Sequence, residues 1–488
     1  MSPQDALEQH QLTRFKDLLH EILPKNRFYT HKYSSILSSY SPDLTISVPQ
    51  LIDSFHSISC VRKLPFVEKK ELLEDQAKNP LYGSNLTYSF NQYTRIHQTS
   101  GTTTGIPLRW LDTPSSWEWI TNCWRLFFPW VGIRSEDIFF FPFSFGPFLA
   151  FWSAFEAACR FGCRVIAGGG MSSSSRLKAI LDHQATVICC TPTYALHLAE
   201  VAENERIDIK NSHVKTLIVA GEPGGSIPET KKRIENAWGA KVFDHYGLSE
   251  VGPIGIECQD SIGTMVILES EMIIEIIDPT TLLPAVPGEI GELVVTNLGR
   301  VGSPLIRYRT GDLTKQSVCE KKREWIENPG SEFQRLDTKS NLTQSRVTNV
   351  DGEKSIVANN PTQLEVEKPP AHWRKISGGI IGRTDDMIFL RGNNVYPSAI
   401  EGIIRQFPEI AEYRIVIDLR SSLPDLKIQI ELFPHQRLAQ HGDGEKLIQD
   451  RIITAIRDQL LFRVEIEVIE FGTLPRYELK AKRIHKIL

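Results

Sequence analysis

The sequence predicts an α/β protein with a large N-terminal domain of helix-covered, mostly parallel sheets plus a small β sub-barrel, and a small mobile α+β C-terminal lid domain. Three observations predict this fold. Short apolar runs alternate with helical patterns up to about residue 310, a polar segment follows, and a compact unit of strands and a helix ends the chain. With 488 residues, the chain is long enough for two or three domains of ~150 residues each.

Residues 1–90 are predicted to form a helical segment of the large domain. The run "RFKDLLHEIL" places apolar residues at helical spacing. The loop-rich stretches "SPDLTISVP" and "KLPFVEKKELLED" follow it. The first residues are amphipathic and lack the apolar stretch of a secretory signal, so we expect no such signal here.

Residues 91–314 are predicted to form the core of the large domain. The strand-like runs "RVIAGG", "ATVICCT", "KTLIVAGEP" and "AKVFDHYG" alternate with the helix-like runs "SRLKAILDH", "TYALHLAEVAE" and "PETKKRIENAW". This alternation favours a parallel sheet covered by helices, in which ligands bind beyond the carboxyl ends of the strands. The later runs "MIIEIID" and "GEIGELVVTN" are bounded by Gly and Pro and indicate an antiparallel sub-barrel.

Two further segments complete the chain. Residues 315–377 are poor in apolar side chains and rich in Glu, Lys, Asn, Thr and Ser, which predicts a solvated, partly disordered insertion. Residues 378–488 contain the strand-like runs "YRIVIDL", "KIQIELF" and "VEIEVIEF" and the helical run "KLIQDRIITAIRDQL". This last unit is small enough to move as one body.

Charge and cysteine content narrow the class of partner. The chain has 55 basic and 59 acidic residues and a net charge of -4, so no global field favours nucleic acid, and a small molecule is the expected partner. Eight cysteines without a CxxC pair favour a reducing, cytoplasmic location over a disulfide framework. The uncharged run 138–155 is interrupted by Pro142, Gly146 and Pro147, so we expect no membrane span.

Four short motifs carry candidate chemistry. "TSGTTTG", Thr99–Gly105, offers backbone N–H groups and hydroxyls to phosphate oxygens, although it is not a Walker A motif and a plain loop fits equally well. In "FDHYGLSEVGP", Tyr246 could stack on a base and Glu250 could hold Mg²⁺. In "YRTGDL", Asp312 could accept hydrogen bonds from ribose hydroxyls. Each of these, and the basic tail "LPRYELKAKRIHKIL", is ordinary when taken alone.

In this order, the motifs resemble those of the adenylate-forming superfamily, which includes acyl-CoA synthetases, luciferases and peptide-synthetase adenylation domains. The phenylacetate-CoA ligase-like branch is the most similar. The resemblance spans nearly the whole chain and includes "TPTYALHLAE", "AGEPGG", "GELVVTN" and the hinge segment "GRTDDMIFLRGNNVYPSAIE". It identifies residues 91–314 as an AMP-binding core and residues 378–488 as the lid.

The resemblance implies an AMP-forming acid–thiol ligase. Such an enzyme uses ATP and Mg²⁺ to convert a carboxylic acid to an acyl-adenylate with release of pyrophosphate, and then transfers the acyl group to the thiol of CoA as co-substrate. Lys480 would be the catalytic lysine that contacts the substrate carboxylate and the α-phosphate, Glu250 would bind Mg²⁺, and Asp385 would be the hinge. A homodimer is compatible with this assignment.

The same resemblance assigns the nucleotide contacts. Phosphate binding would fall to Thr99, Ser100, Gly101, Thr102, Thr103, Thr104 and Gly105. Nucleotide binding would fall to Glu222, Pro223, Asp244, His245, Tyr246, Gly247, Ser249, Asp312 and Arg383. Within this set Tyr246 would stack on adenine, residues 222–224 would line the base pocket, and Asp312 would hold the ribose with Arg383 close by.

The phosphate loop departs from the family pattern. It carries one extra threonine, and Ile106 stands where a lysine is usual. Arg109, or backbone and hydroxyl donors, could replace that lysine. Two other functions stay open: an adenylating enzyme whose acceptor is a carrier protein, an amine or a hydroxyl in polysaccharide assembly, and a non-catalytic nucleotide-binding relative.

The segment "FFFPFSFGPFLAF" matches the acid pocket of the family. It supplies Phe141, Phe143, Phe145 and Phe148, which favours an aromatic or arylalkanoic acid. A core role for each ring is an equal alternative, because residues alternate between the two faces of a strand. A branched or medium-chain acid is the second choice.

Overall fold

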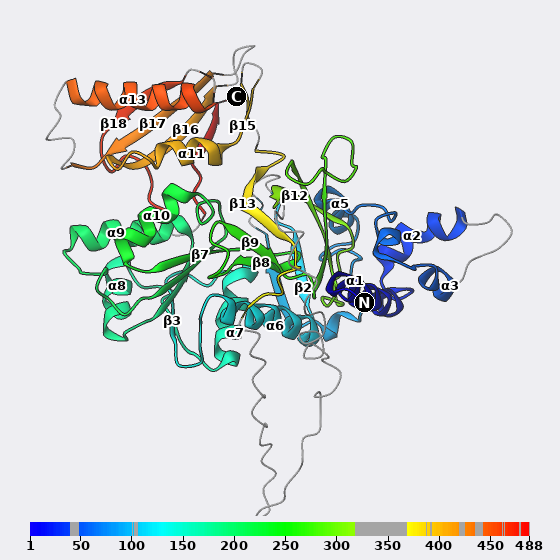
Figure 1. Ribbon diagram of the computed structural model, residues 1–488. Helices are drawn as coiled ribbons and strands as arrows, with labels where there is room; N and C mark the ends of the chain where they lie inside the picture. The colour runs from blue at the N-terminus through cyan, green and yellow to red at the C-terminus, as the bar shows by residue number, and fades with distance from the viewer. Residues whose placement is uncertain are drawn as a thin grey trace, which may run out of the picture.

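The computed structural model shows a large domain with a smaller C-terminal domain seated on one side of it (Figure 1). The structure describes residues 1–39, 48–99, 101, 106–317, 368–386, 388–390, 393–418, 425–434, 443–460, 462, 464–477 and 480–487. The polar segment at 318–367 and most of the phosphate loop therefore lie outside the described residues.

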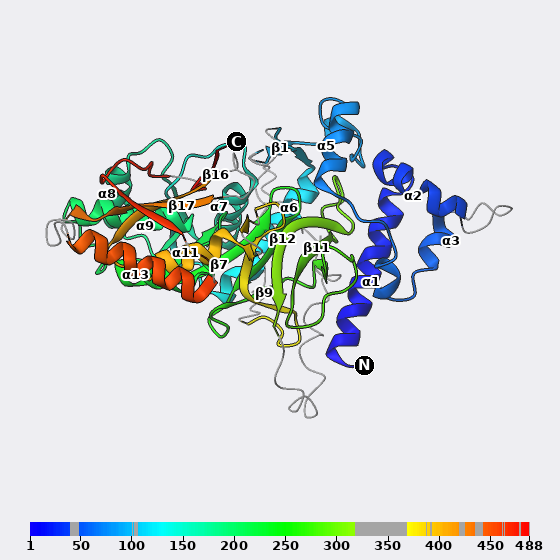
Figure 2. The same cartoon turned by 90° about the horizontal axis from the view of Figure 1, so that it is seen from above.

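Helices form the N-terminal region of the large domain. The first helix begins with a capping box between Ser2 and Asp5 and buries one face, including Phe15, Leu19 and Ile22. The elements are α1 (Pro3–Ile22), α2 (Arg27–Ser39), α3 (Val48–Asp53), α4 (Ile58–Val61), α5 (Lys69–Lys78) and the 3-10 turn η1 (Phe90–Gln92). In Figure 2 this region lies at the opposite end of the molecule from α13 (Asp443–Leu460).

One 11-stranded mixed sheet runs through the large domain in the order β10-β11-β12-β13-β9-β8-β7-β6-β5-β3-β4. Its parallel part comprises β3 (Ile138–Phe141), β4 (Arg164–Ala167), β5 (Val187–Cys190), β6 (Thr216–Ala220) and β7 (Lys241–Leu248). Its antiparallel part comprises β8 (Gly252–Glu257), β9 (Thr264–Ile267), β10 (Met272–Ile277), β11 (Ile290–Asn297), β12 (Tyr308–Gln316) and β13 (Lys375–Arg383). The strands expected in a separate sub-barrel thus continue the same sheet.

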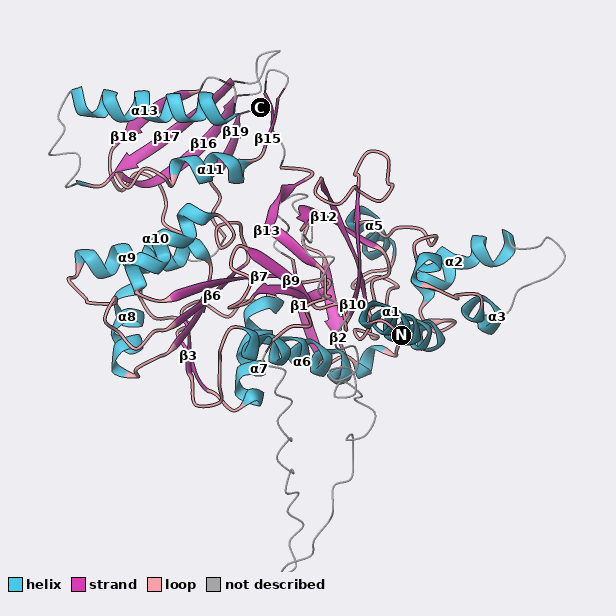
Figure 3. Cartoon of the chain, in the orientation of Figure 1, coloured by secondary structure: helices cyan, strands magenta, loops and turns pink. Residues whose placement is uncertain are grey.

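Helices cover both faces of the parallel part of the sheet. The side chains of β3 show this, because they point alternately to the two faces and pack against different helices. Phe139 and Phe141 belong to the apolar cluster that contains residues of α6 and α7, whereas Phe140 belongs to the cluster of α8, α9 and α10. Figure 3 shows these helices around the strands. Their bounds are α6 (Pro114–Trp130), α7 (Leu149–Phe161), α8 (Ser173–Asp182), α9 (Pro192–Asn204) and α10 (Pro228–Trp238).

The C-terminal domain has its own core and its own four-stranded sheet, ordered β18-β17-β16-β19. Its elements are β14 (Ile388–Leu390), β15 (Asn393–Val395), α11 (Pro397–Ile404), β16 (Ile410–Asp418), β17 (Asp425–Leu432), α13, β18 (Glu465–Ile469) and β19 (Ile484–Ile487). The domain boundary expected at 378 falls inside β13, which pairs with β12 and β9. Residues up to Arg383 are therefore part of the large sheet.

The uncharged run at 138–155 forms a buried strand, a loop and the start of a helix. β3 ends at Phe141, and α7 begins at Leu149. Among the described residues, no helix has the length and apolar character that crossing a bilayer requires.

Candidate active site

The candidate site lies at the carboxyl end of β7, where the sheet changes from parallel to antiparallel. β7 pairs in parallel with β6 on one side and antiparallel with β8 on the other. The ladder shifts register between Tyr246 and Gly247, and a Cβ atom on Gly247 would lie 2.8 Å from the Gly252 carbonyl oxygen. Glycine is therefore required at this bulge.

Alternation along β7 separates three residues that the sequence grouped together. Asp244 and Tyr246 lie on one face of β7. The Tyr246 hydroxyl donates a 2.6 Å hydrogen bond to Asp312, which lies on β12 in the antiparallel part of the sheet. His245 instead stacks on Trp124 with ring centroids 3.9 Å apart. Burial lowers the pKa of His245 to about 3, so its ring is neutral at pH 7. The structure therefore places His245 in the aromatic core and not with the other nucleotide-site candidates.

Asp312 is the centre of a small polar cluster. One of its oxygens accepts the Tyr246 hydroxyl, and the other accepts Arg383 Nη1 at 2.8 Å. Burial raises the pKa of Asp312, and Arg383 opposes that rise. Because a carboxylate has about four acceptor positions, Asp312 keeps capacity for further donors such as ribose hydroxyls.

Asp244 lies beside the loop "AGEPGG" that follows β6. The Ser226 hydroxyl donates to its carboxylate, and a Cβ atom on Gly225 would lie 2.5 Å from Asp244 Oδ1. Burial raises the pKa of Asp244 to about 7. The side chain therefore titrates near neutral pH, while Pro223 and the following glycines let the loop approach it closely.

Glu250 is buried in the loop after β7 with two neighbours from distant parts of the chain. Tyr308 donates its hydroxyl to Glu250 Oε1 at 2.8 Å, and Lys69 Nζ lies 3.9 Å from the same atom. Arg300 fixes the loop, because it donates to the Ser249 carbonyl at 2.7 Å while it is paired with buried Asp112. A single held carboxylate of this kind suits Mg²⁺, which takes few protein ligands when it also binds nucleotide phosphates.

Lys69 was not singled out in the sequence. It is the first residue of α5, 181 positions before Glu250 in the numbering, and about a third of its side chain is exposed. Nothing near Lys69 in the sequence indicates a phosphate site, since "EKKELLED" has the pattern of a solvated helix start. Only the fold brings it to Glu250.

The base of the phosphate loop is closed by β1 (Arg95–Gln98) and β2 (Arg109–Asp112), which form an antiparallel pair. The Thr99 hydroxyl accepts the Leu108 N–H at 3.0 Å, and Gly101 has φ +65°. Ser100 and residues 102–105 lie outside the described residues.

Ile106 stands where the phosphate loop of the family usually has a lysine, and Arg109 and Lys69 are candidate cations to replace it. Ile106 is 63 % exposed. The guanidinium of Arg109 donates to the Leu81 carbonyl at 3.2 Å, so in this arrangement it is engaged with the N-terminal region. Lys69 is the cation that the fold brings beside Glu250.

Lys480 enters the site from the C-terminal domain. Its Cε lies 3.7 Å from the position that a Cβ on Gly221 would occupy. Partial desolvation by neighbouring groups lowers the pKa of Lys480, and the carboxylates of Asp312, Glu222 and Glu250 oppose that shift. The residue keeps solvent-exposed surface, so this desolvation is incomplete. Lys480 is thus within electrostatic range of three carboxylates that the large domain presents.

Glu222 makes contacts that the base-pocket assignment did not predict. Its carboxylate accepts the backbone N–H of Thr193 at 2.9 Å and the backbone N–H of Ala481 at 2.6 Å. Burial raises its pKa, with Arg483 opposing.

The expected hinge is also tied to the site. Arg383 Nε donates to Asp385 Oδ1 at 2.8 Å, and the Thr384 N–H donates to the Gly311 carbonyl at 2.8 Å. A Cβ on Gly311 would lie 3.0 Å from Arg383 Nη2. The segment at 383–385 is therefore held against the "TGD" turn in this arrangement.

The four candidate pocket phenylalanines divide into two pairs. Phe141 and Phe143 are buried in the core, whereas Phe145 and Phe148 keep partial exposure. Phe145 packs against Trp152 and Phe155 with ring centroids 4.6 and 5.3 Å apart. Of these four rings, Phe145 and Phe148 are thus the two that keep exposed surface.

Comparison with known proteins agrees with this geometry. Residues 99–299 match the model of the AMP-binding enzyme family, and residues 392–486 match that of the AMP-binding enzyme C-terminal domain. Together these matches cover more than half of the chain. The chain is therefore a member of the AMP-binding, adenylate-forming enzyme superfamily.

Curated relatives place it in the phenylacetate-CoA ligase-like branch. The chain is 28 % identical over 484 residues to phenylacetate-coenzyme A ligase of Pseudomonas putida, covering 99 % of this chain and 94 % of the relative. It is 26 % identical over 436 residues to the enzyme of the same name from Escherichia coli (strain K12), covering 88 % and 86 %.

Solved structures share the fold and differ in how well they superpose. The TM-score is 0.82, at 24 % identity, to 2-hydroxyisobutyryl-CoA ligase in the postadenylation state with 2-HIB-AMP, covering 100 % of this chain and 90 % of that one. For the same ligase with 2-HIB-AMP and CoA in the thioesterification state, the TM-score is 0.62 at 25 % identity, covering 99 % and 90 %.

Proposed function

We propose that this protein is an AMP-forming acyl-CoA ligase that activates an aromatic or arylalkanoic acid. The ATP-dependent formation of an acyl-adenylate and the transfer to CoA follow from its membership of the branch. The observation that carries the proposal is the convergence of Lys480 from the C-terminal domain on Asp312, Glu222 and Glu250 of the large domain. The choice of an aromatic or arylalkanoic acid is a separate part of the proposal, and it rests on the aromatic segment at 141–155.

The residues present fit magnesium-bound ATP. Among the described residues there is no cluster of three or more His, Cys, Asp or Glu side chains that would form a resident metal site. A magnesium ion that arrives with the nucleotide requires only one or two carboxylates, and Glu250 would supply one. Bound there, the ion would supply charge neutralisation of the phosphate oxygens.

In the first half-reaction, the acid carboxylate attacks the α-phosphorus of ATP and the bond to pyrophosphate breaks. We propose that Lys480 stabilises the negative charge that develops on the α-phosphate, because its ammonium can come within reach only from the seated C-terminal domain. Asp312 would accept ribose hydroxyls, and Tyr246 would stack on adenine. Lys69 would lie on the side of Glu250 and face the departing pyrophosphate.

The second half-reaction requires the C-terminal domain to take a different position on the large domain, which we call its seat. The CoA thiol attacks the acyl carbonyl, AMP leaves with the electron pair of the mixed anhydride bond, and the thiol proton passes to solvent. In this structure Lys480 and Ala481 occupy the face that the large domain presents at Gly221 and Glu222. The higher TM-score to the postadenylation state supports the proposal that this arrangement is the adenylating one.

The acid pocket is proposed from Phe145 and Phe148 in the loop between β3 and α7. Both retain exposed surface, and Phe145 packs against Trp152 and Phe155. Aromatic rings stack well on an aryl group, while their faces offer no partner to an anionic substituent. The names of the curated relatives, phenylacetate-coenzyme A ligases, point to the same acid class.

Formation of phenylacetyl-CoA and AMP from phenylacetate, ATP and CoA tests the proposal, with benzoate, octanoate and acetate as competing acids. We expect an arylalkanoic acid to have the highest kcat/KM. If the protein forms the adenylate but no thioester, the result would favour an adenylating enzyme whose acyl acceptor is a carrier protein, an amine or a hydroxyl. ATP binding without turnover of any acid would favour a non-catalytic nucleotide-binding protein. Light scattering tests the proposed homodimer, and cell fractionation tests the proposed cytoplasmic location.

A further inference from the structure

Glu222 forms a bridge between the two domains next to the proposed catalytic lysine. Its Oε1 accepts the N–H of Thr193, and its Oε2 accepts the N–H of Ala481 at 2.6 Å. Thr193 is the second residue of α9, which begins at Pro192 after the N-cap Thr191. A carboxylate is well placed there, because the first N–H groups of a helix lack intrahelical partners. The large domain thus holds Glu222 in position to receive Ala481.

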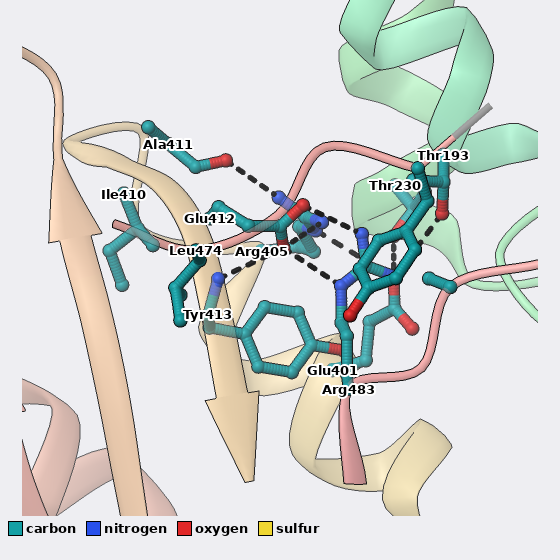
Figure 4. A network of polar contacts seen from close by, with 12 residues as sticks. Thr193, Thr230, Glu401, Arg405, Ile410, Ala411, Glu412, Tyr413, Leu474 and Arg483 are labelled. Atoms are coloured by element: carbon teal, nitrogen blue, oxygen red, sulfur yellow. Dashed lines mark hydrogen bonds and ion pairs between the residues drawn. The ribbon is translucent and has the colours of Figure 1, made fainter. Parts of the chain in front are cut away.

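A second contact anchors the same C-terminal segment at the same helix turn. Arg483 Nη1 donates to the Thr193 hydroxyl at 3.2 Å, while its other nitrogens pair with Glu412 at 2.8 and 3.0 Å. Arg405 Nη2 lies 3.6 Å from Glu412 Oε1, the oxygen that also accepts Arg483 Nε. Figure 4 shows Arg483 between Glu412 of the C-terminal domain and Thr193 of the large domain. Although burial opposes ionisation, Arg483 and Arg405 lower the pKa of Glu412 to about 2, so the pair is charged at neutral pH.

Lys480 differs from Arg483 in its contacts. Among the residues that the structure describes, no ion pair within 4.0 Å involves its ammonium. The described contact nearest to it along the chain is the hydrogen bond of the Ala481 N–H to Glu222. This backbone contact can therefore position the lysine.

We infer that Glu222 is a positioning residue for adenylation, which docks the backbone of Ala481 on the large domain so that Lys480 reaches the reacting phosphate. The inference rests on the proposed function. It assigns Glu222 to the docking of the C-terminal domain, whereas the family resemblance assigns it to the base pocket. The contact belongs to this seat of the C-terminal domain and is lost when Ala481 moves away for thioester formation.

The test is Glu222→Gln, measured in each half-reaction separately. The amide keeps the size of the side chain but loses the charge and one of the two acceptor oxygens. A hydrogen bond to a charged group contributes about 1.5–3 kcal/mol, so acid-dependent ATP–pyrophosphate exchange should fall by about 10- to 100-fold. The Kd for ATP and the rate of thioester formation from supplied acyl-adenylate and CoA should stay within about twofold.

A matched control and a double mutant separate docking from other roles. Glu200→Gln removes a partner of Arg476 at the same domain interface (3.0 Å), but Arg476 keeps Glu431 at 2.9 Å. This control should change exchange by less than about threefold. In a Lys480→Ala background, Glu222→Gln should cause no further loss of exchange, because the two residues act through one contact. If Glu222→Gln does not fold, Ala481→Pro removes the donor N–H from the other side and should give the same selective loss.

Three results would overturn the inference. Weaker ATP binding that accounts for the whole loss would return Glu222 to the base pocket. Equal loss in both half-reactions would make its role purely structural, and full additivity with Lys480→Ala would show that the residues act independently. Wild-type protein without any acid-dependent exchange would instead overturn the proposed function itself, and the inference with it.

Discussion

The two domains contribute opposite kinds of group to the site. The large domain supplies acceptors: the carboxylates of Glu222, Glu250 and Asp312. The C-terminal domain supplies donors: the ammonium of Lys480 and the N–H of Ala481. Because the acceptors are fixed on β12 and on the loops after β6 and β7, while the donors lie on a separate, seated body, a movement of one domain can switch the chemistry without rebuilding the pocket.

The largest expected effect comes from removing the donor on the C-terminal domain. Lys480→Ala should lower acid-dependent ATP–pyrophosphate exchange by about 100- to 1,000-fold, as expected when one group that stabilises transition-state charge is lost. Thioester formation from supplied acyl-adenylate should remain near the wild-type rate. Equal losses in the two half-reactions would mean that Lys480 does not act in adenylation alone, and the division between the domains would fail.

The next variant concerns Lys69, which, like Arg383, is a cation of the large domain and an exception to this division. It lies 3.9 Å from Glu250 Oε1, and the phosphate loop carries Ile106 where a lysine is usual. Lys69→Met should lower exchange by about tenfold, because a charge-assisted contact to phosphate would be lost. Lys70→Met is the matched control, since Lys70 is 84 % exposed and pairs only weakly with Glu74. Equal activity of the two variants would leave phosphate binding to the backbone and hydroxyls.

A smaller and more selective effect is expected in the acid pocket, which belongs to the large domain alone. Phe145→Ala should raise the KM for an arylalkanoic acid by about tenfold, because loss of an aromatic contact costs on the order of 1 kcal/mol or more. The KM for ATP should stay unchanged. Phe90→Ala, at a ring that is 56 % exposed, is the control. An unchanged acid KM would place the pocket elsewhere.

The sequence alone predicted much of this site and missed the parts that depend on the fold. The motif order correctly predicted the family and the fold class, and it named the carboxylates and the lysine that the structure brings together. It grouped His245 with Asp244 and Tyr246, because a motif does not show which face of a strand a side chain takes. It missed Lys69 and the bridge from Glu222 to Ala481, because these contacts join segments far apart in the chain. For Phe141 and Phe143, aromatic content could not separate core from pocket.

The last prediction concerns stability and not activity, at a carboxylate of the large domain. Burial raises the pKa of Asp244 from 3.8 to about 7, so between these values the folded state binds more protons than the unfolded state. Stability contributed by this group therefore falls as pH rises from about 4 to 7, by at most ~1.4 kcal/mol per pH unit, and is level above 7. Asp244→Asn should remove this dependence and raise the urea midpoint at pH 8 more than at pH 5. A wild-type midpoint that rises over this range relative to the variant would contradict the assignment.

The most direct test of the central claim is to fix the C-terminal domain in the present seat and measure both half-reactions. Glu200 and Arg476 are in contact across the interface at 3.0 Å. A Glu200→Cys, Arg476→Cys pair, in a Cys159→Ser background because Cys159 is exposed, could be joined by a short thiol-reactive cross-linker that contains a reducible disulfide. A linker is needed because two long side chains meet here, whereas a direct disulfide requires Cα atoms within about 7 Å. We predict that the cross-linked protein retains acid-dependent ATP–pyrophosphate exchange, loses thioester formation, and regains it when the linker is reduced. Thioester formation at the wild-type rate by the cross-linked protein would contradict the claim that the two steps require different seats of this domain.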